Sequence, residues 1–353
     1  MGISELQFGL DTFGDLTRTS SGRLSSQPQV IREVVEEAVL ADQLGLDFFG
    51  LGEHHRADFA VSSPEVVLAA AASRTERIRL GSAVTVLSSD EPVRVFQRFA
   101  TLDAVSNGRA EVIVGRGSFT ESFPLFGLPL EEYEQLFEEK LELFSALVHE
   151  ERVTWEGSVR PPLVEATVYP RTERPLVTWV GVGGSPQSIV RAAHHGLPVV
   201  LAIIGGDPAR FRPYAELFAR ALSEFGKPAL PVAVHSPGHV AATDTEARER
   251  FWPHYKEMHD RIGAQRGWPR LAREAFEREI EAGSLFVGSA ETVARKIARL
   301  ARLFQPARFQ LKYSAGTLPH DLMLDSIERY ATQVVPMVRD MLAGEERATA
   351  RAA

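Results

Sequence analysis

The segment Glu53-His54-His55 places a carboxylate and two imidazoles directly after the apolar run FFGLG. A single imidazole beside a carboxylate suits proton handling near neutral pH. Adjacent residues of an extended segment point to opposite sides, so both histidines cannot easily enter one metal site. The chain also has no cysteine and no HExxH helix to complete such a site. We therefore expect no metal, and we predict His54 and Glu53 as catalytic residues, with a hydrogen-bonded structural histidine as the alternative.

The segment VGVGGSPQSIV combines two glycines with the start of a helix. Gly183 and Gly184 allow a ligand to approach the backbone closely. Ser185 fits a helix N-cap, with Pro186 at the first helical position and Ser188 one turn further on. Unpaired N–H groups and the positive end of the helix dipole suit a phosphate at such a start. The pattern therefore indicates a phosphate site or, alternatively, an ordinary cap after a tight turn.

The segment VGRGSF places Arg116 between two glycines, with no acidic residue beside it. Its guanidinium can hold a phosphate with two parallel hydrogen bonds, or it can pair with a carboxylate such as Glu53. The strands that precede Arg116 and Ser185 are consecutive along the chain. If they are neighbours in a barrel, the two segments form one anion site.

Eight apolar, β-branched runs alternate with helical patterns, and they read as buried on both faces, as in a parallel sheet. Prolines stand at the start of most of these helices, where the missing N–H costs nothing. Eight strand–helix units predict an α/β fold, a (β/α)8 TIM barrel, with a doubly wound open sheet as the alternative. The strands are expected within 6–13, 48–52, 77–87, 110–115, 177–183, 198–204, 230–236 and 308–314. The helices are expected at 28–44, 64–73, 92–105, 131–148, 186–195, 208–225, 290–303 and 319–342.

We expect one barrel domain over residues 1–343 and a disordered tail over 344–353. Residues 153–175 are long for a barrel connection and read as a small hairpin. Residues 243–285 form a charged insertion with helical patterns between strand 7 and helix 7. This insertion is either a solvated decoration or a lid over the face where barrel active sites lie.

The composition excludes several classes of partner. The net charge of −8 argues against nucleic acid, which requires a positive surface. No apolar run is long enough to cross a membrane, and the N-terminus lacks the layout of a secretory signal. With no cysteine there is no disulfide or thiolate chemistry. We expect a cytoplasmic protein.

Five segments, in this order, resemble the bacterial luciferase-like (alkanal monooxygenase-like) family of flavin-dependent monooxygenases. They are GLGEHH, RIRLGSAVTVLSSDEPVRVFQRFATLDAVSNGRAEVIVGRG, FPLFG, GGSPQSIVRAAHHGLP and FVGSAETVARKIARL. The resemblance covers nearly the whole chain, and it rests on the order and spacing of all five segments together.

The resemblance implies reduced FMN as the cofactor. It matches His54 to the family's catalytic histidine, and it matches Ala83 and Val84 to a pair joined by a cis peptide bond under the flavin ring. It matches the insertion 243–285 to the family's mobile loop. The positions matched to the surroundings of the FMN phosphate are Arg116, Ser118, Gly184, Ser185 and Ser188.

Two positions depart from the luciferase pattern. Gly115 stands where luciferase has a reactive cysteine beside the flavin. Gly184 stands where luciferase has a glutamate near the phosphate, and losing that negative charge favours anion binding.

These observations lead to the hypothesis of a monooxygenase that uses reduced FMN and O2 to oxidise a small organic substrate through a flavin hydroperoxide. No Rossmann fingerprint is present, so a separate flavin reductase is expected to supply the reduced FMN. The alternatives are a deazaflavin-dependent hydride-transfer oxidoreductase on the same barrel, a flavin-binding protein without turnover, and a metal-dependent hydrolase. The resemblance also implies a homodimer, for which Pro64–Ser73 (PEVVLAAAAS) offers a small, apolar surface.

Overall fold

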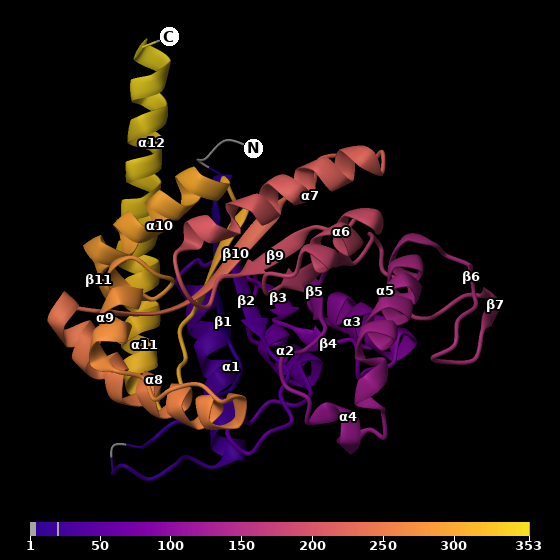
Figure 1. The fold of residues 1–353 in the computed structure, drawn as a ribbon, viewed down its shortest axis with the longest axis horizontal. Coiled ribbons are helices and arrows are strands. Elements are labelled where there is room, and N and C mark those ends of the chain that lie inside the picture. Colours follow the sequence, from indigo (N-terminus) through magenta and orange to yellow (C-terminus); the bar gives the residue numbers. More distant parts are fainter. Residues whose placement is uncertain (1–4, 20, 353) are drawn as a thin grey trace.

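A closed barrel of eight parallel strands forms the centre of the molecule (Figure 1). The computed structural model describes residues 5–19 and 21–352, with side chains through Gly344. The first and last strands pair in parallel, with Gln7 opposite Arg308, and this pairing closes the barrel. In spatial order the barrel strands are β1 (Gln7–Thr12), β2 (Phe48–Leu51), β3 (Arg79–Ser82), β5 (Ala110–Gly115), β8 (Val177–Val182), β9 (Val199–Ala202), β10 (Val232–Ala241) and β12 (Arg308–Lys312).

The predicted TIM barrel is therefore confirmed, and closure excludes the open doubly wound sheet. Each of the eight strands lies within its predicted segment except β10, which continues to Ala241. Its outer half pairs with an additional strand, β11 (Phe286–Ser289), with Gly238 opposite Phe286. A side chain at Gly238 would place its Cβ 2.3 Å from the Phe286 carbonyl oxygen, so this pairing requires glycine. A two-residue strand, β4 (Thr85–Val86), pairs with β5.

Helices surround the barrel at the predicted positions. Proline occupies the first turn of α1, α2, α3, α6 and α7, as expected for a residue that lacks an N–H. These helices are α1 (Gln27–Gln43), α2 (Pro64–Ala72), α3 (Pro92–Val105), α5 (Tyr133–His149), α6 (Pro186–His194), α7 (Arg212–Glu224), α10 (Ala290–Phe304) and α11 (His320–Arg329). Shorter helical turns are α4 (Ser122–Leu125), η2 (Leu130–Glu132) and η3 (Pro208–Phe211).

Both long connections are folded segments, and the second contains a strand, β11, that was not predicted. β6 (Val153–Trp155) and β7 (Leu163–Ala166) make an antiparallel hairpin. The insertion between β10 and α10 contains α8 (Asp244–Arg266), α9 (Arg273–Glu281) and β11. Figure 1 shows α8 and α9 beside the barrel, on the side of α11.

The C-terminal helical segment runs past the barrel. After α11, a π-helical turn (η4, Tyr330–Val334) leads into α12 (Val335–Ala352), which projects away from the other helices (Figure 1). The backbone of the predicted tail, 344–353, continues α12 as far as Ala352. The side chains beyond Gly344, and Ala353 as a whole, lie outside the described residues.

The barrel interior contains an ion pair as well as apolar side chains. Phe48, Ile113 and Trp179 form an inner apolar cluster. The fully buried Arg308 guanidinium lies 3.9 Å from the centre of the Phe48 ring and donates a 2.8 Å hydrogen bond to Glu111. Burial raises the pKa of the Glu111 carboxyl, but the charges and hydrogen bonds of Arg308 and Arg79 together hold that pKa below its usual value. Side chains therefore fill this part of the barrel interior.

Candidate active site

His54 lies in an aromatic cage just beyond the carboxyl end of β2. Its ring centre is 4.8 Å from that of Phe13, 4.4 Å from that of Phe59 and 5.0 Å from that of Phe119. Burial lowers the pKa of His54 to about 3, although the nearby Asp15 carboxylate opposes this shift. Its Nε2 atom is buried and has no hydrogen-bond partner among the described residues. His54 is therefore a neutral imidazole with one polar atom free for a ligand.

Glu53 makes no hydrogen bond to His54 in the structure. Its Oε1 atom lies 2.7 Å from Nε2 of His55, and its Oε2 accepts a 2.9 Å hydrogen bond from the Val86 N–H. The reason is the alternation of an extended segment, in which residues two apart share a side and adjacent residues do not. Glu53 instead joins the end of β2 to β4. Its catalytic role stays a prediction, since no contact with His54 supports it.

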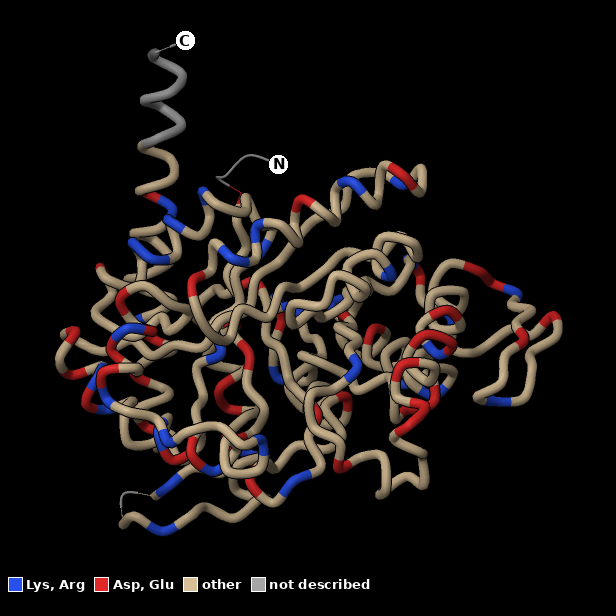
Figure 2. The backbone as a smooth tube through the Cα atoms, viewed as in Figure 1, with Lys and Arg blue, Asp and Glu red and all other residues tan. Residues whose placement is uncertain are grey.

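Two arginines from neighbouring parts of the barrel share one carboxylate. Arg116, directly after β5, forms an ion pair with Glu134 of α5. Arg191 of α6 lies 3.4 Å from the same carboxylate and 3.2 Å from that of Glu138. Figure 2 shows acidic positions gathered along α5. The end of β5 and the last turn of α6 therefore each present a guanidinium group to the same carboxylate.

Arg191 has unused hydrogen-bonding capacity. Its side chain is only 10% exposed, and its Nε and Nη1 atoms are buried without partners among the described residues. Buried donors of this kind are costly unless a ligand or water satisfies them. The sequence analysis missed Arg191, although it stands three residues after Ser188 on the same face of the helix that carries the predicted cradle.

The start of α6 has the predicted cap. Ser185 is the N-cap residue, and its Oγ accepts a 3.4 Å hydrogen bond from the Ser188 N–H. Gly184 adopts a φ of +108°, which side-chain-bearing residues rarely adopt. An added Cβ at Gly183 would meet no atom within 4 Å, so the backbone there is open to close approach. Ser118 is exposed, and its carbonyl accepts a hydrogen bond from Arg266 rather than from any member of this group.

Val84 explains why position 115 is a glycine. The Ala83–Val84 peptide bond is cis, as the resemblance predicted. A Cβ at Gly115 would lie 2.8 Å from one Val84 methyl, and a Cβ at Gly181 would lie 2.8 Å from the other. Val84 thus fills the space that a larger residue at position 115 would need.

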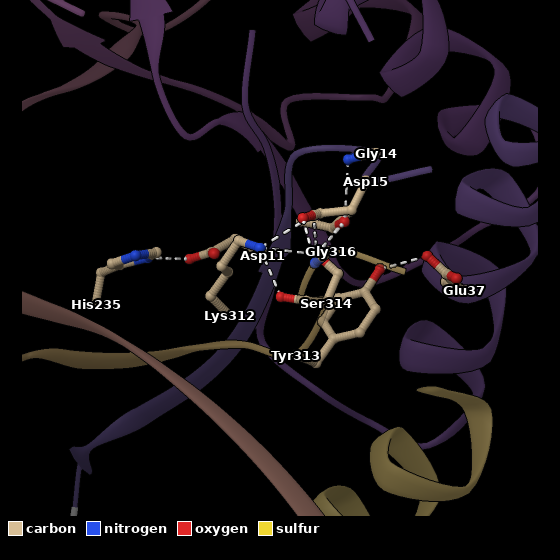
Figure 3. Close-up of polar contacts among 10 residues, drawn as sticks. Asp11, Gly14, Asp15, Glu37, His235, Lys312, Tyr313, Ser314 and Gly316 are labelled. Carbon is tan, nitrogen blue, oxygen red and sulfur yellow. Dashed lines mark hydrogen bonds and ion pairs between the residues drawn. The ribbon is translucent and has the colours of Figure 1, made fainter. Parts of the chain in front are cut away.

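A second polar group lies at the ends of β1, β10 and β12 (Figure 3). His235 Nδ1 is 2.7 Å from Oδ2 of Asp11, and Lys312 Nζ is 3.0 Å from Oδ2 of Asp15. The sequence analysis noted neither aspartate, because each looked like an isolated polar residue beside an apolar strand. The pairing depends on strands that are distant in sequence and neighbours only in the closed barrel.

The insertion contacts the loops that follow β2 and β5. Arg261 of α8 lies 3.2 Å from Asp58, and Gln265 accepts a 2.9 Å hydrogen bond from Arg56. Beneath these contacts is a cavity of about 460 Å³. It is lined by Leu16, Leu24, His55, Arg56, Ala57, Asp58, Glu121, Arg261 and Gln265. The charged insertion is therefore not a free decoration, because it is ion-paired to the loop that follows β2.

Comparison with known proteins agrees with this geometry. The family profile described as luciferase-like monooxygenase matches residues 12–304. The chain belongs to this family.

Proteins similar to the chain include both monooxygenases and an F420-dependent dehydrogenase. A crystal structure of the monooxygenase RslO1 from Streptomyces bottropensis has a TM-score of 0.80 and 25% identity, covering 94% of this chain and 99% of that one. An alkanal monooxygenase alpha chain from the Kryptophanaron alfredi symbiont is 27% identical, covering 54% of each chain. An F420-dependent glucose-6-phosphate dehydrogenase from Intrasporangium calvum is 36% identical, covering 43% of this chain and 48% of the relative. The luciferase-like family thus includes both monooxygenases and deazaflavin-dependent enzymes.

Two further features of this luciferase-like chain concern metal binding and membrane crossing, within the residues that the structure describes. Among the described residues, no three His, Asp or Glu side chains are placed to hold a metal ion. No described helix is long and apolar enough to cross a membrane.

Proposed function

We propose that the protein is a flavin-dependent monooxygenase that uses reduced FMN and O2 to oxidise a small organic substrate. The observation that supports this most strongly is the anion cradle between the ends of β5 and β8. Arg116 and Arg191 share the carboxylate of Glu134 there. The open Gly183 and the capped start of α6 directly follow the neighbouring strand β8. Because the chain belongs to the luciferase-like family, we expect the bound anion to be the phosphate of a flavin or a deazaflavin cofactor.

The residues of the cradle fit a phosphate. Arg116 and Arg191 would hold its oxygens, and Gly183, Gly184 and Ser185 would present backbone and hydroxyl groups. Glu134 now pairs with both arginines, but its side chain is 59% exposed and can turn towards solvent. A phosphate dianion would replace one carboxylate charge with two, and it would satisfy the unpaired donors of Arg191.

Ser118 and Ser188 remain proposed members of the cradle. The buried Ser188 supports it by donating its N–H to the cap, whereas Ser118 would have to approach the ligand from the loop that also contacts α8. Ala83 and Val84 would lie beneath the flavin ring. They are partly buried against the inner apolar cluster, which gives a flat, apolar floor.

Bound reduced FMN would supply the electrons that activate O2. His54 would contribute a hydrogen bond at Nε2 from its ring, whose neutral form is favoured because burial lowers the pKa of His54. The aromatic side chains around it would exclude water from the reacting atoms. The insertion would act as a lid, with Arg261 and Gln265 as its contacts to the barrel.

Replacing His54 by Ala tests this assignment. FMN affinity should stay within about twofold, because His54 does not contact the cradle residues. Oxygen consumed with a flavin reductase and NADH should then appear as hydrogen peroxide rather than as oxidised substrate. Unchanged coupling between oxygen use and product would contradict the role of His54.

A deazaflavin-dependent oxidoreductase is the second candidate, favoured by the 36% identity to an F420-dependent relative. Titration with FMN and with F420, monitored by flavin fluorescence, separates the two cofactors. Oxygen uptake with the preferred cofactor then separates a monooxygenase from a hydride-transfer enzyme. A protein that binds FMN but consumes no oxygen above the free-flavin background would be a flavin-binding module without turnover.

We also propose a cytoplasmic homodimer served by a separate reductase. The exposed face of α2 supports the dimer, since Val66 is 65% exposed on an otherwise small and apolar helix. Sedimentation of the wild type and of Val66→Glu tests this surface. A monomeric wild type would exclude it.

A further inference from the structure

The Asp11–His235 pair lies across the barrel from the anion cradle. In the closed sheet, β1 and β12 stand diametrically opposite β5 and β8, and β10 is the neighbour of β12. Asp11 is fully buried and His235 is only 7% exposed. Their 2.7 Å contact joins Oδ2 to Nδ1 (Figure 3). A flavin whose phosphate lies in the cradle would extend its ring towards this side of the mouth.

The other ring nitrogen of His235 is available. Nε2 has no hydrogen-bond partner among the residues that the structure describes, and it is not fully enclosed. The Phe13 ring lies parallel to the imidazole, with centres 6.3 Å apart, and the same ring contacts His54 edge-on. His235 and His54 therefore flank one aromatic side chain at the mouth.

The nearby Asp15 is a useful comparison, because its carboxylate has the hydrogen bonds expected of a structural residue. Asp15 accepts hydrogen bonds from Ser314 at 2.6 Å, from Gly316 at 2.9 Å and from Lys312 at 3.0 Å, so both of its oxygens are satisfied. Asp11 has only His235, and its Oδ1 atom is buried without a partner. A buried carboxylate with one partner is costly for folding. A role in orienting the His235 ring would account for a carboxylate in this costly position.

We propose that His235, oriented by Asp11, accepts a proton at Nε2 from a phenolic or enolic hydroxyl of the substrate. This inference rests on the proposed function and names the substrate class. In the step, the O–H bond of the substrate breaks, an Nε2–H bond forms, and the electron pair stays on oxygen. The products are an oxyanion and an imidazolium paired with Asp11, and no oxidant is required. The anion is the electron-rich form that an oxygenating enzyme can attack.

The chemistry of the mouth selects this substrate class. An imidazole removes a proton effectively only from acids close to it in strength, which includes phenols and enols but not aliphatic alcohols. The Phe59 ring contacts those of Phe13 and Phe119, so the side chains around the two histidines are aromatic and suit a flat, apolar substrate. Asp11 is a positioning residue, since it acts only through His235.

The test uses p-nitrophenol, whose anion absorbs visible light, with purified protein and no flavin. At a pH below the pKa of the free probe, binding to wild type should produce the anion band. His235→Gln should abolish that band. Asp11→Asn should lower the ionised share of bound probe by about tenfold, because a hydrogen bond to a charged group is lost. His320→Gln, which removes an imidazole–carboxylate pair that contacts neither Asp11 nor His235, should leave the band unchanged.

Flavin titration keeps the two proposals separate. Each variant should retain FMN affinity within about twofold, since neither residue contacts the cradle. Failure of wild type to bind FMN would contradict the proposed function while leaving the probe result valid. An anion band that persists in His235→Gln, or a wild type that binds the probe only as the neutral phenol, would overturn the proposed role of His235. Circular dichroism confirms that each variant is folded, and His235→Asn serves as the second variant.

Discussion

Replacing Arg191 by Gln is expected to weaken the binding of FMN but not of riboflavin, which lacks the phosphate. Arg191 is 10% exposed, and two of its donor atoms are buried without partners among the described residues. Two charge-assisted hydrogen bonds to a phosphate, at ~1.5 kcal/mol each, would contribute ~3 kcal/mol. That energy corresponds to about a hundredfold change in the dissociation constant.

The assay is a fluorescence titration of wild type and Arg191→Gln with each ligand, at two salt concentrations. Arg116→Gln should behave similarly, with a smaller loss of about tenfold because that side chain is more exposed. Arg212→Gln is the matched control, since Arg212 pairs with Glu216 on the outer surface of α7. Equal losses for FMN and riboflavin, or no loss for either, would refute the assignment of Arg191 to the phosphate.

Three further outcomes are expected from other parts of the molecule. Gly115→Cys should lower the free energy of unfolding by ~1–3 kcal/mol in chemical denaturation, because its Cβ would overlap Val84, and Val84→Ala should relieve that loss. Burial lowers the pKa of His239 in the folded protein to about 4. Between pH about 6.5 and about 4 this histidine is protonated in the unfolded chain but neutral in the folded one, so the free energy of unfolding should fall as the pH decreases through that range. The total loss is ~3 kcal/mol, and a His239→Leu variant should show a smaller pH dependence in thermal melts. Asp58→Ala should release α8 and increase hydrogen exchange in that helix, whereas unchanged exchange would show that its contact with Arg261 does not hold the lid.

Much of the fold could be predicted from the sequence because the local signals agree with the global structure. Continuous apolar runs such as AEVIVG are buried on both faces in β5, and proline marks the first turn of α6. The position of the insertion followed from a long charged stretch between two apolar segments. The extension of β10 was missed because Gly238 and Pro237 read as a strand end, and only its pairing with β11 reveals otherwise.

The parts of the candidate site that could be predicted are those whose residues all lie in one short segment of the sequence. Ser185 and its proline define a helix start by themselves, and the structure confirms the cap. Arg191, Asp11 and the Glu53–His55 pair were missed because their roles depend on partners. An arginine inside a helix looks like surface charge until the fold places it beside Glu134 and buries its donors.

A crystal structure of the protein soaked with FMN tests most directly whether the ends of β5 and β8 hold a flavin. The expected result is a phosphate between Arg116, Arg191 and the first turn of α6, with Glu134 displaced and the flavin ring over Val84. A flavin bound elsewhere, or a cradle still closed by Glu134 at saturating FMN, would contradict the proposal.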